Sequence, residues 1–509
     1  MDKLLVLDFG GQYSHLIARR IREVGVYSEV LNPDRDDLLE ISELEEIKGL
    51  VLSGGAFSVY DEGAPECSEE VLELACPVLG ICYGHQLLAQ LVGGEVSPGE
   101  SAEYGNTDLT IRRHNHLLSG LEETETVWMN HKDTVLSMPD RFSILATTDH
   151  SPVAVFADPG RDLYGVQFHP EVSHTDKGKK VLENFAVSIC GANPSWDPRV
   201  AGEEMVAEAE EALKGRRAVI GLSGGVDSST AAAITSRAIG DRLHAVYVDT
   251  GLMRRGDTRF IQETFSGSSL NLHIVDASDR FFKALKGVSD PEEKRKAVGA
   301  TFIDVFDEVA REVQADVLIQ GTIYSDRIES GITEHSATIK SHHNVGGLPE
   351  EMDLEVYEPL RNLYKDEVRQ VAEEFGLPEV TRTRHVFPGP GLAIRIVGEV
   401  TPEKAEIVRS ASYIVEDELR NEGLYTDFWM AFAVLLSIRS VGIQGDARSY
   451  KYPIVVRVIE SEDAMTANFA RLPYDLLQRI STRITNEIQE VNRVAYDISN
   501  KPPSTMEWE

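Results

Sequence analysis

Short apolar runs alternate with helical stretches along the first third of this 509-residue chain. The pattern predicts strands at residues 4–8, 47–52 and 77–81, with helical stretches between and after them. A similar pattern returns later, with strands predicted at residues 218–222, 244–248 and 317–320. Strands that alternate with helices form parallel sheets, so we expect α/β architecture with two doubly wound, mainly parallel sheets.

Two breaks in this alternation suggest where domains meet. Residues 191–198 contain glycine, asparagine and two prolines, which is typical of a linker. The second break lies near residues 386–391, and after it helices mix with β-rich runs such as 454–459. We therefore expect three domains: doubly wound domains at residues 1–192 and 193–384, and a smaller α+β domain at residues 385–509. Several domains also agree with the chain length, which exceeds what one hydrophobic core supports.

The chain is strongly acidic, with a formal charge of −34. Such a surface repels nucleic acid and anionic membranes. No apolar run approaches the ~20 residues that cross a bilayer, and the first apolar run is too short for a signal peptide. We expect a cytoplasmic enzyme without a nucleic-acid or membrane partner. The charge fits either an ordinary acidic enzyme or adaptation to a salty cytoplasm. The chain has 16 lysines and 34 arginines, and this scarcity of lysine agrees with adaptation to salt.

The four cysteines all lie in the first 190 residues, and none forms a CxxC pair, which disfavours a zinc or redox site. Cys82 lies between Gly80 and Gly84, where a predicted apolar strand meets a predicted helix. The glycines permit a tight turn that exposes the sulfur, and the helix N-terminus stabilises a thiolate. This pattern predicts a nucleophile elbow with cysteine as the nucleophile. A small buried core cysteine is the alternative.

Candidate partners for Cys82 lie in two other segments. His169 and Glu171 lie at the predicted end of a strand, where residues two apart share a face and can act as a base and its orienting carboxylate. Ser53-Gly-Gly55 follows another predicted strand, and its glycines let backbone N–H groups approach a ligand. We expect the N–H groups of Gly55 and Tyr83 to be oxyanion donors. Plain surface turns are the alternative for both segments.

Taken together, these segments resemble the class I glutamine amidotransferase family over about the first 190 residues. The resemblance implies that Cys82 attacks the side-chain amide of glutamine. It further implies that His169 protonates the leaving ammonia and later activates water, and that Glu171 orients His169. Gln86, in the helix after the elbow, matches a residue that this family uses near the glutamine.

A glycine-rich loop, Ser223-Gly-Gly-Val-Asp-Ser-Ser229, joins a predicted strand to a predicted helix at residues 230–239. Backbone N–H groups and a helix dipole at such a junction form an anion site. The loop is no Walker A motif, because it lacks Gly-Lys-Ser/Thr. It resembles the signature of the N-type ATP pyrophosphatases. The resemblance implies ATP binding by Ser223, Gly224, Gly225, Val226, Asp227, Ser228 and Ser229. Asp227 is our candidate ligand for Mg²⁺, which would carry phosphate charge.

ATP pyrophosphatases of this kind deliver either ammonia or an amine to an acceptor, or sulfur to tRNA. The sulfur carriers use cysteines in the ATP domain, whereas no cysteine follows Cys190 here. The acidic charge also disfavours tRNA as a substrate. These two observations favour amination.

Further segments resemble the glutamine-hydrolysing GMP synthetase family, so that the resemblance covers essentially the whole chain. They include residues 340–347, 387–395 and 501–509. The resemblance implies that ATP adenylylates the C2 oxygen of XMP and that ammonia then displaces AMP to give GMP. Pyrophosphate and glutamate are the other products. Another ATP-dependent synthetase and a catalytically silent relative are the alternatives.

The same resemblance assigns roles to residues of the second half of the chain. It implies that XMP binds to Arg295, Gln444, Lys501 and Glu507. It places Lys340 in a lid over the ATP site and implies a homodimer formed through residues 385–509. A solvated charge run is the alternative for Arg295, and a frayed tail is the alternative for residues 501–509.

Overall fold

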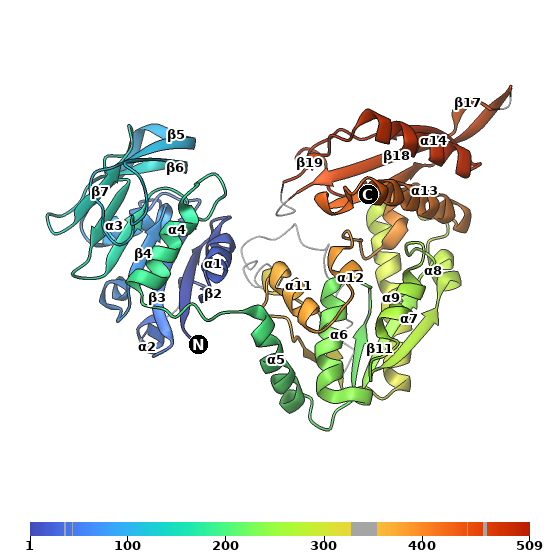
Figure 1. The fold of residues 1–509 in the computed structure, drawn as a ribbon, viewed down its shortest axis with the longest axis horizontal. Coiled ribbons are helices and arrows are strands. Elements are labelled where there is room, and N and C mark those ends of the chain that lie inside the picture. Colours follow the sequence, from blue (N-terminus) through green and yellow to red (C-terminus); the bar gives the residue numbers. More distant parts are fainter. Residues whose placement is uncertain (35–36, 43, 327–353, 445, 462–465) are drawn as a thin grey trace. The chain divides into compact units, whose positions relative to one another are not determined.

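The computed structural model describes residues 1–34, 37–42, 44–326, 354–444, 446–461 and 466–509. By its contacts the chain divides into two compact units, Met1–Asp197 and Pro198–Glu509 (Figure 1). Within the described residues, no helix has the length and apolarity needed to cross a membrane. The three-domain boundaries expected from the sequence stay predictions.

The first unit contains a nine-stranded sheet in the order β2-β1-β3-β4-β9-β8-β7-β5-β6. Pairing is parallel from β2 to β9 and antiparallel from β9 to β6. The strands are β1 Lys3–Phe9, β2 Tyr27–Leu31, β3 Ile47–Gly55, β4 Val78–Ile81, β5 Glu95–Ile111, β6 Thr124–Ser137, β7 Ser143–Thr147, β8 Val155–Asp158 and β9 Leu163–Val166. The helices are α1 Ser14–Glu23, α2 Leu38–Ser42, α3 Tyr83–Leu91 and α4 Gly178–Glu183, with the short helical turns η1 Glu69–Glu73 and η2 Asn184–Ile189. The strands predicted at residues 4–8, 47–52 and 77–81 correspond to β1, β3 and β4.

The second unit begins with a parallel sheet in the order β12-β11-β10-β13-β14. Its strands are β10 Ala218–Gly221, β11 Leu243–Asp249, β12 Asn271–Asp276, β13 Val317–Ile319 and β14 Glu355–Tyr357. Its helices are α5 Pro198–Ala212, α6 Val226–Ile239, α7 Asp257–Phe265, α8 Ser278–Ala284, α9 Pro291–Glu312, α11 Lys365–Glu374 and α12 Glu379–Thr383, with the short turn η3 Gly240–Arg242. The sequence predicted that α6 begins at Thr230, which was wrong. The helix begins at Val226, so half of the glycine-rich loop forms its first turn.

A second sheet in this unit has the order β15-β16-β18-β17, and β19 and β20 also pair with β18. The strands are β15 Ile396–Val397, β16 Met430–Leu436, β17 Ser440–Gln444, β18 Ala447–Glu460, β19 Asn468–Phe469 and β20 Val491–Tyr496. The helices α13 Pro402–Asn421 and α14 Tyr474–Glu487 pack against it, and the turns η4 Gly391–Arg395 and η5 Tyr425–Asp427 precede its strands (Figure 1). Two α/β sheets and a smaller α+β part confirm the predicted fold class.

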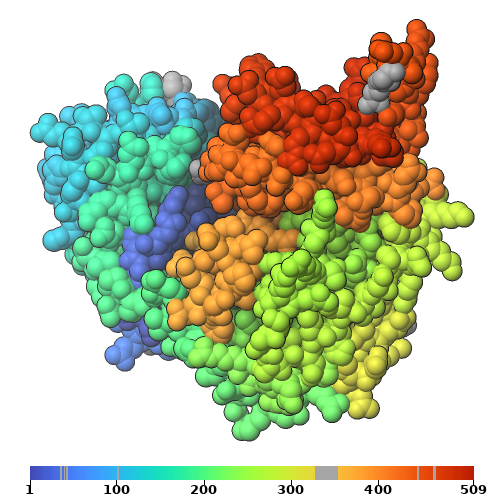
Figure 2. Space-filling view, turned by 45° about the vertical axis from the view of Figure 1, so that its right-hand side comes forward, coloured from blue at the N-terminus to red at the C-terminus, as the bar shows by residue number. Residues whose placement is uncertain are grey.

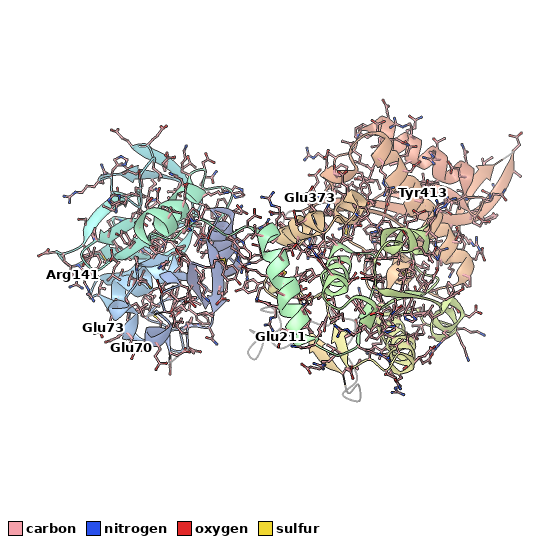
Figure 3. The ribbon with its side chains drawn as sticks, turned by 60° about the horizontal axis from the view of Figure 1, so that its bottom comes forward. Glu70, Glu73, Arg141, Glu211, Glu373 and Tyr413 are labelled. Atoms are coloured by element: carbon pink, nitrogen blue, oxygen red, sulfur yellow. The ribbon has the colours of Figure 1, made fainter. Side chains whose placement is uncertain are left out.

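One hydrophobic core serves both sheets of the second unit. It includes Val246 and Phe306 from the parallel sheet and its helices, and Val456 and Ile480 from the second sheet and its helices. The first unit has a core cluster of its own, built around β1, β3 and β4. Part of the negative charge is exposed on the surface, at Glu70 and Glu73 of the first unit and at Glu211 and Glu373 of the second (Figure 3).

Candidate active sites

Cys82 lies at the turn between β4 and α3, with backbone angles of φ +54° and ψ −103°. Residues with side chains rarely adopt this left-handed region, and such strain is concentrated at functional sites. A Cβ on Gly80 would lie 2.4 Å from the carbonyl oxygen of Gly84, and one on Gly84 would lie 2.3 Å from that of Leu52. Only glycine fits at either position, so the elbow turn depends on both.

His169 and Glu171 form a buried pair beside Cys82. The distance between Nδ1 of His169 and Oε1 of Glu171 is 2.7 Å. A Cβ on Gly54 would lie 3.3 Å from Cε1 of His169 and 3.8 Å from Cβ of Cys82, so the imidazole and the cysteine adjoin the same glycine. Burial lowers the pKa of His169, but the charges of Glu171 and Cys82 outweigh burial and raise it well above its usual value.

The backbone route by which His169 and Glu171 meet differs from the predicted one. The sequence predicted that both residues extend a strand, whereas β9 ends at Val166 and the two residues lie in a turn. Pro170, between them, has no N–H to donate to a strand ladder. The backbone N–H of His169 donates instead to the carbonyl oxygen of Trp128 on β6, at 3.0 Å. The pair is therefore positioned by a turn anchored on β6, and strand alternation has no part in it.

The two expected oxyanion donors are neighbours. Tyr83 is the first residue of α3, and the N–H of a first helical residue has no acceptor within its helix. Gly55 ends β3, and a Cβ added to it would lie 3.0 Å from Cγ of Tyr83. The role of the two N–H groups in binding an oxyanion stays a prediction.

Strand β6 forms a wall of this site that the sequence did not reveal. Nε2 of Gln86 donates to the carbonyl oxygen of Asp133 at 2.8 Å, so Gln86 supports this wall. The carboxylate of Asp133 accepts hydrogen bonds from the hydroxyl groups of Ser58 and Tyr60, the latter at 2.6 Å, and so holds the segment after β3. The thiol of Cys82 lies 3.7 Å from another β6 carbonyl oxygen, that of Asn130.

A buried histidine and a buried carboxylate are hydrogen-bonded at this wall. Nε2 of His131 lies 3.1 Å from Oε2 of Glu103, and Nδ1 of His131 lies 2.9 Å from the carbonyl oxygen of Asp133. Burial raises the pKa of Glu103, but hydrogen bonds from His131, Thr148 and Ser151 outweigh burial and lower it. The wall of the site is therefore held by a hydrogen-bonded network, which fixes its position.

The glycine-rich loop of the second unit lies between β10 and α6. Gly224 has φ +75°, which glycine adopts without strain. Oγ of Ser223 accepts from the N–H of Gly225 at 3.2 Å and lies 3.1 Å from Oγ of Ser228, so the loop is closed by its own hydroxyl groups. Because α6 begins at Val226, the N–H groups of its first turn point toward the loop, which is the arrangement of a phosphate site.

Asp227 is paired with a cation from a distant helix, α11. Nζ of Lys365, the first residue of α11, is hydrogen-bonded to Oδ2 of Asp227. The other carboxylate oxygen, Oδ1, is buried and has no hydrogen-bond partner among the described residues. Oγ of Ser229, also in the first turn of α6, is likewise buried, and the part of the chain that the structure describes offers it no partner. Buried oxygen atoms of this kind fit a hard cation such as Mg²⁺.

Two of the four expected XMP residues contact the end of the chain. Glu507 forms a two-pronged ion pair with Arg395, at 3.0 and 2.7 Å. Nη2 of Arg295 donates to the backbone oxygen of Glu509, and Nζ of Lys294 pairs with the carboxylate of Glu509. The alternative of a frayed tail does not hold for residues 507–509, because buried cations hold them in place.

The other two expected XMP residues lie in regular pairings. The backbone of Lys501 pairs with Ala467, through hydrogen bonds of 2.8 and 3.0 Å. Gln444 is the last residue of β17 and pairs with Ala447 of β18. Lys340 lies outside the described residues. Lys501 and Glu507 thus lie in the terminal segment and Arg295 contacts it, whereas Gln444 lies in β17. The XMP-binding role of all four residues stays a prediction.

Arg457 anchors the same terminal segment from β18. Its guanidinium donates to the side chain of Asp497 at 2.6 Å and to the backbone oxygens of Thr505 and Met506 at 2.8 and 3.1 Å. Its side chain is buried. No local sequence signal marked Arg457 or Arg395, because their partners lie far along the chain.

Comparison with known proteins gives matches in three parts of the chain. A model of class-I glutamine amidotransferases matches residues 5–189, one of NAD synthase matches residues 203–295, and one of the GMP synthase C-terminal domain matches residues 417–508. The glutamine-hydrolysing GMP synthase of Carboxydothermus hydrogenoformans is 51% identical and covers 100% of both chains. That of a Synechococcus species is 50% identical, over 100% of this chain and 97% of the relative. The GMP synthase of Caldanaerobacter subterraneus is 50% identical, over 100% of this chain and 99% of the relative.

Proposed function

This chain belongs to the glutamine-hydrolysing GMP synthase family, and we propose that Cys82 in its first unit releases the ammonia that its second unit attaches to XMP. The reaction is the ATP-dependent amination of XMP to GMP, with glutamine as the amide donor. AMP, pyrophosphate and glutamate are the other products. The observation that carries the assignment of residues is the elbow of Cys82 beside the buried His169–Glu171 pair.

In the first half of the reaction, the Cys82 thiolate attacks the side-chain amide carbon of glutamine. The N–H groups of Gly55 and Tyr83 donate to the oxyanion that forms. His169 gives a proton to the leaving ammonia, and its raised pKa supports this role because it favours the protonated imidazole. His169 then takes a proton from water, which hydrolyses the thioester to glutamate. Glu171 orients the imidazole throughout.

In the second half, the C2 oxygen of XMP attacks the α-phosphorus of ATP. The bond to the bridging oxygen breaks, and its electron pair leaves with pyrophosphate, which the loop at residues 223–229 holds. Ammonia then attacks C2, and AMP leaves with the former XMP oxygen. Ammonia must reach C2 before it becomes ammonium, so we expect a water-excluded route.

Mg²⁺ is the cation that we expect at Asp227. Oδ1 of Asp227, which is buried and without a hydrogen-bond partner among the residues that the structure describes, supports this, and the buried Oγ of Ser229 is a second oxygen on the same turn. When bound, Mg²⁺ would neutralise charge on the phosphate oxygens. Lys365 forms an ion pair with the other carboxylate oxygen, Oδ2, and supplies a second positive charge beside the loop.

We further propose that the terminal segment positions the purine nucleotide. Glu507 is held by Arg395, which leaves the carboxylate fixed in direction, and Arg295 lies beside the same segment. Lys501 and Gln444 complete the set that the family resemblance implies. The ordered tail supports a binding role, because a carboxylate that recognises a base must be held in place.

A homodimer and a cytoplasmic location complete the proposal. The hairpin of β17 and β18 stands out from the second unit and carries exposed Val441, Ile443 and Tyr450, of which Ile443 is 77% exposed (Figures 1 and 2). Apolar side chains grouped in this way favour association with another protein surface. A second copy of the chain is the partner that we propose. The location that we propose is the cytoplasm, because the reaction consumes ATP and glutamine.

Separation of the two activities tests this function. We expect Cys82→Ala to lower glutamine-dependent GMP formation at least about a thousandfold while ammonia-dependent formation persists. The matched control is Cys76→Ala, since Cys76 is a buried cysteine of the same unit whose pKa burial raises to about 11. Loss of both activities in the Cys82 variant would contradict the two-site scheme. If AMP release from ATP depended on a purine other than XMP, the assignment of XMP as the acceptor would be contradicted.

A further inference from the structure

Arg384 is a cation beside the glycine-rich loop that the scheme above does not use. It directly follows α12, and its Nη1 lies 3.1 Å from the position that a Cβ on Gly224 would occupy. A side chain at position 224 would thus meet the guanidinium. The missing side chain of Gly224, together with its φ of +75°, lets the cation lie against the backbone of the loop.

The guanidinium of Arg384 is held from two other sides. It stacks over the ring of Phe260 on α7, at 4.5 Å from the ring centroid. Its Nη2 pairs with the carboxylate of Asp257, the first residue of α7. The side chains of Arg384 and Asp257 are only 13% and 5% exposed. Asp257 also accepts from the backbone N–H of Arg254 at 3.1 Å, so its own position is fixed.

These contacts orient Arg384 toward the loop. Arginine presents five donors in a rigid planar fork, and its pairing with Asp257 through Nη2 leaves Nη1 on the side of Gly224. A buried ion pair adds little stability over well-packed apolar groups, so stability alone does not account for this arrangement. Fixed guanidinium groups are well suited to phosphate oxygens, which they bind through short, charge-assisted hydrogen bonds.

We propose that Arg384 is a further phosphate-binding residue, which donates to the pyrophosphate portion of ATP and to pyrophosphate as it leaves. The inference rests on the phosphate-binding role proposed for the loop at residues 223–229. When the bond between the α-phosphorus and the bridging oxygen breaks, negative charge builds up on the leaving group. Arg384 is already in place at that moment, so no reorganisation is needed to stabilise the charge.

Binding of inorganic pyrophosphate with Mg²⁺, measured by calorimetry on the full-length protein, tests this inference. Binding to the unaltered protein tests the loop itself, and its absence would overturn the proposed role of the loop. If the unaltered protein binds pyrophosphate, we expect Arg384→Gln to weaken its affinity for pyrophosphate by about 10- to 100-fold, which corresponds to the loss of a charged hydrogen bond. The matched control is Arg382→Gln, whose side chain on α12 pairs with Glu373 at 3.2 Å and should leave the affinity unchanged.

A second variant separates phosphate binding from a merely structural ion pair. Arg384→Gln alone leaves Asp257 buried without its partner, which can disturb the fold. The double variant Arg384→Gln/Asp257→Asn removes both charges, and an unchanged thermal unfolding transition of the second unit reports that it is folded. We expect the double variant to bind pyrophosphate as weakly as the single one. Recovery of the original affinity in the double variant, or unchanged affinity in the single one, would overturn the proposal.

Discussion

Replacing Gly84 by alanine should disable the first site while leaving the second intact. The added Cβ would lie 2.3 Å from the carbonyl oxygen of Leu52 and 2.6 Å from its Cβ. Ordinary contact between such atoms is ~3.5 Å, so β3 and α3 must separate by about 1 Å. Overpacking of this kind costs about 1–3 kcal/mol, which lowers the unfolding midpoint by roughly 2–12 °C for a unit of this size.

The same shift acts on catalysis, because Gly55 ends β3 and Tyr83 begins α3. A misplacement of about 1 Å can lower a rate by roughly a hundredfold. We expect this loss in glutamine-dependent GMP formation, with ammonia-dependent formation unchanged. Gly160→Ala is the control, since its Cβ would meet only Oδ1 of Asp158 at 3.4 Å. Glutamine-dependent activity within twofold of the unaltered enzyme would refute the argument, as would equal loss of both activities.

Three further predictions concern titration, the terminal segment and salt. Because the pKa of His169 is raised, the stability that its pairing with Glu171 adds is present below about pH 6.5 and is lost as pH rises through the raised pKa. Glu171→Gln should lower that pKa in an NMR titration of the imidazole, and an unchanged value would contradict the electrostatic account. Arg395→Met leaves the Glu507 carboxylate unpaired at a local cost of about 3–5 kcal/mol. The KM for XMP and the rate of hydrogen exchange near residue 507 should therefore rise, while glutaminase activity stays constant. Adding Glu507→Gln should restore slow hydrogen exchange, and failure to do so would contradict the ion-pair account. Raising KCl from about 10 to 150 mM shortens the Debye length from roughly 30 to 8 Å. Because the chain has a net charge of −34, this screening should weaken the repulsion among its acidic groups and raise the midpoint of thermal unfolding. A constant midpoint would show that this repulsion is unimportant.

The parts of the fold that could be predicted depend on neighbours in sequence. The glycines around Cys82 and the serines of the glycine-rich loop lie within a few residues of the turns that they form, so their spacing alone indicated these turns. The alternation of apolar runs likewise indicated the parallel strands. By contrast, β5 and β6 had no counterpart among the predicted elements. Their pairing is antiparallel and half exposed, and the α/β pattern gives no hint of it.

The contacts that could not be predicted join residues far apart along the chain. Lys365 reaches Asp227 across 138 residues, and Arg395 reaches Glu507 across 112. Local periodicity carries no information about such pairs. The position of His169 shows a subtler limit: its nearness to Glu171 was expected, but for the wrong reason, because the turn at Pro170 and its anchor on β6 replace the strand.

The hydrophobic core that serves both sheets of the second unit limits how this enzyme can be divided. A truncated protein that ends near residue 384 would lack Val456, Ile480 and the rest of the second sheet's share of the core. Val246 and Phe306 would then lie at an exposed apolar surface, which would favour aggregation. The segment Met1–Asp197 has its own core and can be exchanged as a module between proteins. Recombination, in nature or in the laboratory, is therefore expected to replace the first unit alone, whereas the two sheets of the second unit are inherited together.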